Sequence, residues 1–196
     1  MSEGVFMVKI LAFAGSLRKD SWNKKLLNIA VGGVRKSGAE ITVIDLKDYP
    51  LPLYDQEIED ASGIPAKAME LKTLFKQHDA LLLACPEYNS SITGVLKNTI
   101  DWVSRPVKGE EDLAAFKNKL ALLISASPGA LGGLRGLVHV RSILGNLGVT
   151  VLPQQRAIGK CTEAFADDGT LKDANAQQAV EALGEQLAER TQKWVD

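Results

Sequence analysis

Three short segments of this chain carry the side chains best suited to hold a ligand, and each segment follows an apolar run. The first contains Ser16, Leu17, Arg18, Ser21 and Asn23, the second Pro86, Glu87, Tyr88 and Asn89, and the third Ser127 and Gly129. Their hydroxyls, amides, guanidinium and backbone N–H groups are suited to bind an anion or a flat heterocycle. The segments contain no metal-ligand spacing and no nucleophile elbow, so we expect a binding site with no catalytic side chain and no metal.

The first segment follows a predicted strand at residues 8–14 and precedes a helix whose apolar stripe comprises Leu26, Leu27, Ile29, Ala30 and Val34. A loop at a helix N-terminus offers free backbone N–H groups, which attract a phosphate dianion. The spacing is not that of a P-loop, and Gly15 lacks the glycine partners of the dinucleotide fingerprint. The alternative is a plain helix cap with a solvated Arg18, and this segment alone leaves both interpretations open.

The second segment leads from the apolar run at residues 80–84 into a helical pattern with Val95, Leu96, Ile100 and Val103 on one face. In an open α/β sheet, ligands bind outside the carboxyl ends of the strands. Glu87, Tyr88 and Asn89 together exceed what a turn requires, so they predict a loop that holds a flat ligand. The alternative is a loop that only caps the helix beginning near Thr93.

The third segment follows a predicted strand at residues 120–125 and is rich in glycine and other small residues up to Gly136. Small residues allow the backbone to approach a planar ligand closely, and glycine supplies unusual backbone dihedrals where they are needed. A sheet with a purely structural role has no need of three such loops. Their coincidence therefore favours one ligand site at the edge where three strands end.

The composition fits a compact enzyme and excludes several other classes of protein. The chain has 196 residues, 45% of them hydrophobic and 24% charged, with a formal net charge of -1. This charge gives no electrostatic case for a nucleic-acid or membrane partner. We expect no transmembrane span and no signal peptide, and the two separated cysteines, Cys85 and Cys161, favour a reducing cytoplasm.

Strand and helix patterns alternate along the chain. Strands are predicted at residues 8–14, 41–46, 80–84, 120–125 and 149–152, and later helices at 65–78, 131–147 and 175–194. The connection at residues 48–55 is broken by prolines and cannot be a central strand. The pattern predicts one α/β domain over residues 1–196, a doubly wound five-stranded parallel sheet in the flavodoxin-like order 2-1-3-4-5 with helices on both faces.

Two segments resemble the signatures of the NADPH-dependent FMN reductase family, a group of flavodoxin-like proteins that includes bacterial quinone, chromate and azo-dye reductases. They read Gly15-Ser16-Leu17-Arg18-Lys19-x-Ser21-x-Asn23 and Pro86-Glu87-Tyr88-Asn89-x-Ser91-Ile92-x-Gly94-Val95-Leu96-Lys97-Asn98-x-Ile100-Asp101-Trp102. The resemblance extends from about Val8 to Pro153. Thr93 stands where the family often has proline, which predicts a looser loop, and Ser90 stands where it often has glycine.

The resemblance implies an oxidoreductase that binds FMN and uses NADPH or NADH as co-substrate. The flavin phosphate would lie in the first segment and the isoalloxazine ring against the second and third. The implied acceptor is a small molecule such as a quinone, a flavin, an azo dye or chromate. A non-enzymatic FMN electron carrier and an FMN-binding regulatory module are the alternatives, although carriers tend to be strongly acidic and this chain is not.

The same resemblance implies a homodimer or homotetramer. Trp102, Val103 and the helix predicted at residues 131–147 are expected to present more apolar surface than a monomer of this size needs. A second chain at the flavin edge would then help to shape the nicotinamide pocket.

Overall fold

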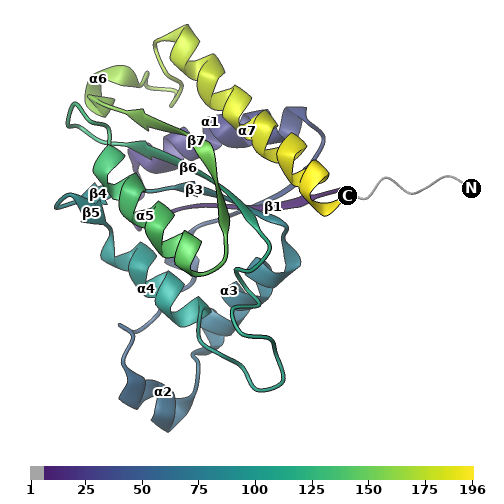
Figure 1. Ribbon diagram of the computed structural model, residues 1–196. Helices are drawn as coiled ribbons and strands as arrows, with labels where there is room; N and C mark the ends of the chain where they lie inside the picture. The colour runs from purple at the N-terminus through teal and green to yellow at the C-terminus, as the bar shows by residue number, and fades with distance from the viewer. Residues whose placement is uncertain (1–6) are drawn as a thin grey trace, which may run out of the picture.

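A computed structural model describes residues 7–196 of the chain, and a five-stranded parallel sheet lies at its centre (Figure 1). The strands are β1 (Lys9–Ala14), β2 (Glu40–Ile44), β3 (Ala80–Ala84), β6 (Leu120–Ala126) and β7 (Thr150–Ile158). Their order across the sheet is β2-β1-β3-β6-β7, and each neighbouring pair is parallel. This is the predicted order 2-1-3-4-5, because β4 (Glu87–Tyr88) and β5 (Ser91–Ile92) form a separate two-stranded hairpin.

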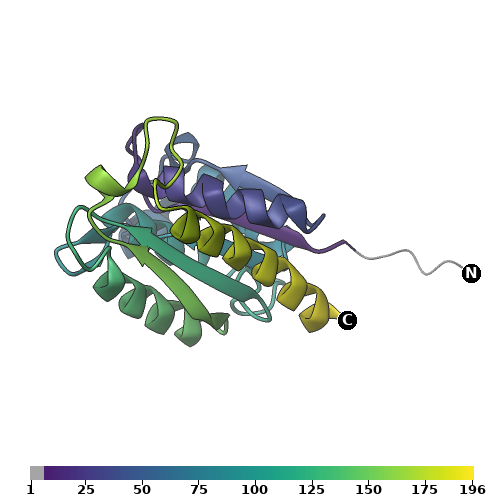
Figure 2. The same cartoon turned by 90° about the horizontal axis from the view of Figure 1, so that it is seen from above.

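Helices cover both faces of the sheet, as predicted. Figure 2 shows α1 (Trp22–Lys36) and α7 (Ala174–Val195) side by side over one face, and α3 (Ala66–Gln77), α4 (Gly94–Val103) and α5 (Leu134–Asn146) cover the other. Alternate residues of β1 point to the two cores: Ile10 and Ala12 pack beneath α1 and α7, whereas Leu11 and Phe13 pack beneath α3 and α4. Strands buried on both faces are expected to read as continuous apolar runs, which is why the sequence marked them clearly.

The contact between α1 and α7 depends on two glycines. A Cβ atom on Gly33 would lie 1.9 Å from the carbonyl oxygen of Glu181, and one on Gly184 would lie 2.0 Å from that of Ala30. Both distances are far below van der Waals contact. The two helices therefore pack backbone to backbone where they meet.

The edge strand β7 is longer than predicted, since the predicted strand ended at residue 152. Pro153 and the polar residues after it resemble a loop, but an edge strand tolerates proline and exposes one side to solvent. The register against β6 shifts between Ala121 and Leu123, after which pairing continues to Ala126 and Ile158. The added length brings β7 to the edge of the sheet where the three segments lie.

The connection after β2 contains no strand, as predicted, but it does contain a 3-10 turn (Leu46–Asp48) and a short helix, α2 (Gln56–Ser62), that the sequence did not indicate. The side chains of Asn98 and Trp102 both donate to the carbonyl oxygen of Pro52, at 2.9 and 2.8 Å. Trp102 and Val103 are completely buried. The expectation that these two residues present apolar surface to a partner is therefore wrong, because this connection and the core cover them.

Candidate functional site

The three predicted segments follow β1, β3 and β6, which are neighbours in the sheet, so their loops meet at its carboxyl edge. They enclose a cavity of about 70 Å³, here called the three-loop cleft. Its lining consists of Ser16, Arg18, Ser21, Trp22, Asn23, Pro86, Glu87, Tyr88, Ala126, Ser127 and Pro128. Of the predicted site residues, only Leu17, Asn89 and Gly129 do not line this cavity.

The first loop, residues 15–21, leaves the start of α1 open towards the cleft. Ser21 is the N-cap residue of α1 and its side chain makes no capping hydrogen bond. The first N–H groups of a helix have no acceptor within the helix. Ser16 and Ser21 are buried beside this end, whereas Arg18 is exposed at its rim. Such a set of donors, with no carboxylate in the loop segment that lines the cleft, fits a phosphate dianion.

The remaining predicted residue of the first loop, Leu17, does not line the cleft, although its neighbours Ser16 and Arg18 do. Its side chain lies on the other side of the loop, where it lines a separate hollow with Leu46, Tyr49 and Val95. We therefore expect any contact of Leu17 with a ligand to come from its backbone N–H.

Asn23 ties the first turn of α1 to the end of β6. Its Nδ2 donates to the carbonyl oxygen of Ala126 at 2.8 Å, and its Oδ1 accepts from the N–H of Ala126 at 3.0 Å. The amide is buried, and both of its polar atoms already have a backbone partner. Asn23 therefore ties the start of α1 to the end of β6, between the first and third loops. The phosphate contact predicted for it stays a prediction.

The second loop is a hairpin, a more regular structure than the sequence indicated. Asn89 and Ser90 connect β4 to β5 with φ values of 50° and 64°. Positive φ at both central residues is typical of a two-residue hairpin turn, in which asparagine is favoured. Pro86 is buried at its base, and Tyr88 is 54% exposed. The hairpin places Asn89 at its tip, outside the lining of the cleft.

Glu87 is bonded to the N-terminus of α5. One carboxylate oxygen accepts from the N–H groups of Arg135 and Gly136 at 3.0 and 3.2 Å, and the other accepts from the Arg135 guanidinium at 2.7 and 3.0 Å. Burial alone would raise the pKa of Glu87, but the hydrogen bonds and charge of Arg135 and the bond from Gly136 together hold it below its ordinary value. The Glu87 carboxylate therefore caps α5, the helix that follows the third loop.

The third loop, residues 127–133, is held against the end of β7. The N–H of Ser127 donates to the carbonyl of Ile158 at 3.1 Å, and the N–H of Lys160 donates to the carbonyl of Gly129 at 3.2 Å. Gly132 and Gly133 have φ values of 64° and 94°. Residues with these left-handed dihedrals cannot belong to the helix, so α5 begins at Leu134. The helix was predicted to begin three residues earlier, at residue 131. Gly129 itself is exposed, and a Cβ atom on it would meet only the Ser127 hydroxyl, at an ordinary contact distance of 3.8 Å.

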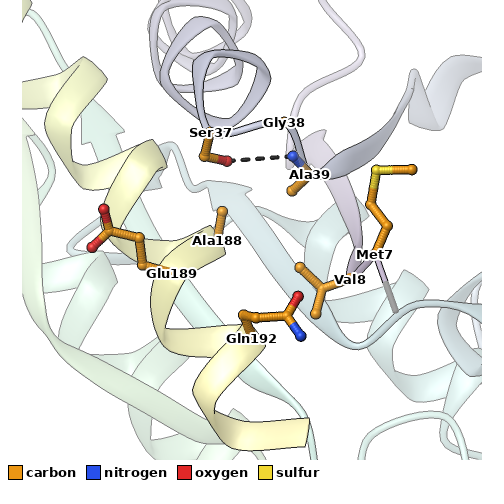
Figure 3. A pocket seen from close by; sticks show the side chains of 8 residues that line it. All are labelled: Met7, Val8, Ser37, Gly38, Ala39, Ala188, Glu189 and Gln192. Atoms are coloured by element: carbon orange, nitrogen blue, oxygen red, sulfur yellow. Dashed lines mark hydrogen bonds between the residues drawn. The ribbon is translucent and has the colours of Figure 1, made fainter. Parts of the chain in front are cut away.

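A larger hollow of about 480 Å³ lies at the opposite, amino end of the sheet (Figure 3). It is lined by Met7, Val8, Ser37, Gly38, Ala39, Ala188, Glu189 and Gln192. Its lining offers no cationic side chain, and the Ser37 hydroxyl already accepts from the N–H of Ala39 at 3.4 Å (Figure 3). We therefore take the three-loop cleft as the candidate site because donors converge on it, although the other hollow is larger.

The histidines and cysteines lie outside the cleft lining. The ring nitrogens of His78 contact the carbonyl of Leu74 at 2.6 Å and the hydroxyl of Thr42 at 2.8 Å. Cys85 and Cys161 are buried free thiols, and burial raises the pKa of both. Within residues 7–196 no three His, Cys, Asp or Glu side chains form a group that could hold a metal ion. Over the same residues no helix is long and apolar enough to span a membrane.

Sequence reasoning missed the parts that Trp22, Pro128, Arg135 and Thr93 have in the site. Trp22 and Pro128 line the cleft, Arg135 binds Glu87, and Thr93 caps α4. Thr93 could have been found, because a threonine directly before a helical pattern is a typical N-cap. Arg135 had no such signal, since its partner is remote in the sequence.

Comparison with known proteins agrees with this geometry. The family model described as NADPH-dependent FMN reductase matches residues 8–163. An NAD(P)H-dependent FMN reductase of Pseudomonas aeruginosa is 35% identical over 189 residues, covering 96% of this chain and 95% of that protein. A quinone reductase of Escherichia coli K12 is 32% identical, covering 94% and 96%. The structure of the flavoenzyme NAD(P)H:(acceptor) oxidoreductase FerB from Paracoccus denitrificans superimposes with a TM-score of 0.77 at 27% identity, covering 95% and 98%.

Proposed function

Because this chain belongs to the NADPH-dependent FMN reductase family, we propose that it oxidises NAD(P)H and reduces a quinone, using FMN held in the three-loop cleft. The observation that carries the proposal is the meeting of three ligand-type loops at one edge of the sheet. Relatives named quinone reductase support a quinone as the acceptor class. Free flavins, azo dyes and chromate are competing acceptors that an experiment must compare.

The first loop would hold the flavin phosphate. The N–H groups at the start of α1, the N–H of Leu17 and the hydroxyls of Ser16 and Ser21 supply donors. Arg18 at the rim supplies a positive charge, and a charge-assisted hydrogen bond to phosphate is roughly twice as strong as a neutral one. Asn23 acts on the phosphate indirectly, because it fixes the first turn of α1 against Ala126.

The second and third loops would hold the isoalloxazine ring. Pro86 and Tyr88 line the cleft from the second loop, and Ser127 and Pro128 line it from the third. Gly129 would approach the ring through its exposed backbone, next to that lining. Asn89 would reach the ring from the hairpin tip. Glu87 keeps the hairpin and α5 in register through its bonds to Arg135 and Gly136. We therefore assign Glu87 a positioning role in place of a direct contact with the flavin.

No side chain of this chain needs to act as a nucleophile or general base. Bound FMN supplies the redox chemistry, because flavins accept hydride from a nicotinamide and pass electrons to an acceptor. The protein binds the ring, orients it and leaves one face open to substrates.

Purification followed by analysis of the released cofactor tests the binding proposal. The protein is expected to be yellow and to release FMN on heating, because the cleft offers one phosphate site. A chromatographic peak of FAD in place of FMN would contradict the proposal.

Anaerobic mixing with NADPH, and separately with NADH, tests for enzymatic turnover. An enzyme bleaches its own flavin rapidly with at least one nucleotide, whereas an electron carrier or a regulatory module does not. Steady-state rates with a panel of quinones, free flavins, an azo dye and chromate then rank the acceptors. A rate with quinones lower than with every other acceptor would overturn the quinone assignment.

We also propose that the protein works in the cytoplasm as a symmetric dimer or tetramer. Leu134 and Val138 on α5, with Leu131 before it and Tyr88 on the hairpin, are exposed apolar side chains, and they lie on two elements joined by Glu87. Exposed apolar patches are typical of protein contacts. Light scattering at micromolar concentration is expected to give a molar mass at least twice that of the monomer, 21.1 kDa. A Val138→Glu variant should lower that mass, and a wild-type mass equal to the monomer would refute assembly.

A further inference from the structure

Thr93 links the first and second loops through a single buried hydroxyl. Its Oγ1 donates to the carbonyl oxygen of Gly15 at 2.7 Å and accepts from the N–H of Leu96 at 3.3 Å. The side chain is 3% exposed, so both bonds are shielded from water. Gly15 is the first residue after β1, and Thr93 is the last residue before α4. One hydroxyl thus joins the start of the predicted phosphate loop to the start of the helix behind the hairpin.

This bond fixes the orientation of a particular peptide plane. The carbonyl of Gly15 and the N–H of Ser16 belong to the same planar peptide unit. The carbonyl accepts from Thr93, while the N–H donates to the carbonyl of Ala14 at 2.8 Å. The N–H of Gly15 in turn donates to the carbonyl of Ala84 at 2.9 Å. Of these three hydrogen bonds, only the one from Thr93 connects Gly15 to the second loop and α4.

Close packing around Gly15 also fixes its position relative to α4. A Cβ atom on Gly15 would lie 3.0 Å from the Cβ of Leu96, so the loop backbone packs directly on the first turn of α4. A shift of that turn would move the Gly15 peptide with it. The direction of the Gly15 carbonyl determines the path of the backbone through Ser16, which lines the cleft, and on to Leu17.

The backbone at Thr93 also accommodates a proline. Its φ of -73° lies within the range that a proline ring imposes, about -65 ± 15°. Proline would keep this dihedral but has no hydroxyl for Gly15. A looser loop was expected from a threonine at this position. That expectation, which stays a prediction, left out the hydroxyl, which adds a bond between two loops that proline could not make.

We propose that Thr93 is a positioning residue for FMN: through the Gly15 carbonyl it sets the geometry of the phosphate loop and couples that loop to α4. The inference rests on the proposed FMN site. Thr93 does not line the cleft, so its effect on the cofactor passes through the backbone of residues 15–17. The hydroxyl positions the loop, and the stiffness of the backbone at residue 93 does not.

Three variants separate the hydroxyl from backbone stiffness. Thr93→Val keeps the shape and removes the hydroxyl, Thr93→Pro keeps φ and removes the hydroxyl, and Thr93→Ser keeps the hydroxyl. Thr99→Val is the matched control, because Thr99 is equally buried on α4 and its hydroxyl bonds only within the helix, to Val95 at 2.8 Å. Each protein is measured as apo-protein and after titration with FMN.

We expect Thr93→Val and Thr93→Pro to weaken FMN binding about five- to tenfold, the scale of one net hydrogen bond. In the apo-proteins, amide hydrogen exchange at residues 16–18 should accelerate by a similar factor. Thr93→Ser should stay within about twofold of wild type, again on the scale of a retained bond. Thr99→Val should lose stability but change neither FMN affinity nor exchange in the first loop.

Several outcomes would overturn the inference. Wild-type affinity and wild-type exchange in Thr93→Val would show that the bond does not position the loop. Wild-type affinity in Thr93→Pro with a loss in Thr93→Ser would assign the effect to stiffness. If wild type itself binds no FMN, the proposed function fails, while the exchange of residues 16–18 in the apo-proteins still decides whether Thr93 orders the loop.

Discussion

The two ends of α1 lie at opposite ends of the sheet and differ in how their backbone groups are satisfied. At the C-terminal end, the N–H of Ser37 donates to the carbonyls of Gly33 and Val34, and the N–H of Gly38 donates to that of Arg35. The Ser37 hydroxyl also donates to the carbonyl of Val34 at 2.6 Å. At the N-terminal end, the N-cap Ser21 offers no side-chain hydrogen bond. The end that borders the larger hollow is closed, and the end that borders the smaller cleft is open.

The N-terminus of α5 shows how the first N–H groups of a helix are satisfied by the protein itself. Its N-cap is Gly133, which has no side chain to contribute, yet the N–H groups of Arg135 and Gly136 are satisfied by Glu87 from the second loop. The same loop leaves the start of α1 without such a carboxylate. The comparison teaches that donors left open by the fold, and not cavity volume, distinguish the candidate site.

Asn23→Ala should have the largest effect, because it would undo the tie at the open end of α1. Two buried backbone groups of Ala126 would lose their partner, at about 1–3 kcal/mol each, so we expect the free energy of unfolding to fall by about 2–6 kcal/mol. Chemical denaturation of the apo-protein measures this. Asn28→Ala, exposed on the same helix, is the control and should change stability little. Equal stabilities of the two variants would mean that the bonds between Asn23 and Ala126 do not stabilise the fold.

Arg18→Ala sharpens the contrast between the open and closed ends. We expect FMN binding to weaken by about 1.5–3 kcal/mol, the range for hydrogen bonds to charged groups. Titration of the apo-protein with FMN measures the change. Arg35→Ala removes the same side chain from the closed end of α1 and should leave FMN affinity unaltered. Equal losses in both variants would mean that net charge, and not a phosphate contact, attracts the cofactor.

Glu87→Gln tests whether a carboxylate is required at the start of α5. We expect a loss of about 1 kcal/mol in stability at pH 7, because Arg135 is largely exposed and solvent weakens its share of the interaction. The pKa of Glu87 is lowered in the folded state, so its stabilisation is present above the ordinary value of 4.5 and is lost as the pH falls through the lowered pKa.

The stability difference between wild type and Glu87→Gln should therefore shrink below about pH 4.5 and vanish at lower pH. Denaturation curves between pH 3 and 7 measure it, with the exposed Glu111→Gln as control. A difference that grows on acidification would have the wrong sign and would exclude the proposed cap.

Ser37→Ala should have the smallest effect and examines the closed end directly. Its exposed hydroxyl donates to the carbonyl of Val34 and accepts a long bond from the N–H of Ala39, so the free energy of unfolding should fall by about 0.5–1 kcal/mol. FMN affinity should not change. A shift in affinity would mean that the two ends of α1 are coupled, contrary to the comparison.

The sequence predicted the sheet well where strands are buried on both faces. The predicted strand at residues 80–84 coincides with β3, and the predicted strand order is confirmed. It predicted the edge strand β7 poorly, because an exposed strand with a proline reads as a loop. The hairpin β4–β5 and the helix α2 were missed, since elements this short have too few residues to establish a period.

What the sequence determined by itself was which residue types gather at the carboxyl edge of the sheet. Apolar runs locate the strands, their number favours one order, and that order brings three polar loops together. What only the tertiary structure decided was the partner of each polar side chain. Asn23, Glu87 and Thr93 bond to backbone groups 103, 49 and 78 residues away. The physical reason is that a side chain bonds whichever buried group lacks a partner, and such groups exist only once distant segments have packed together.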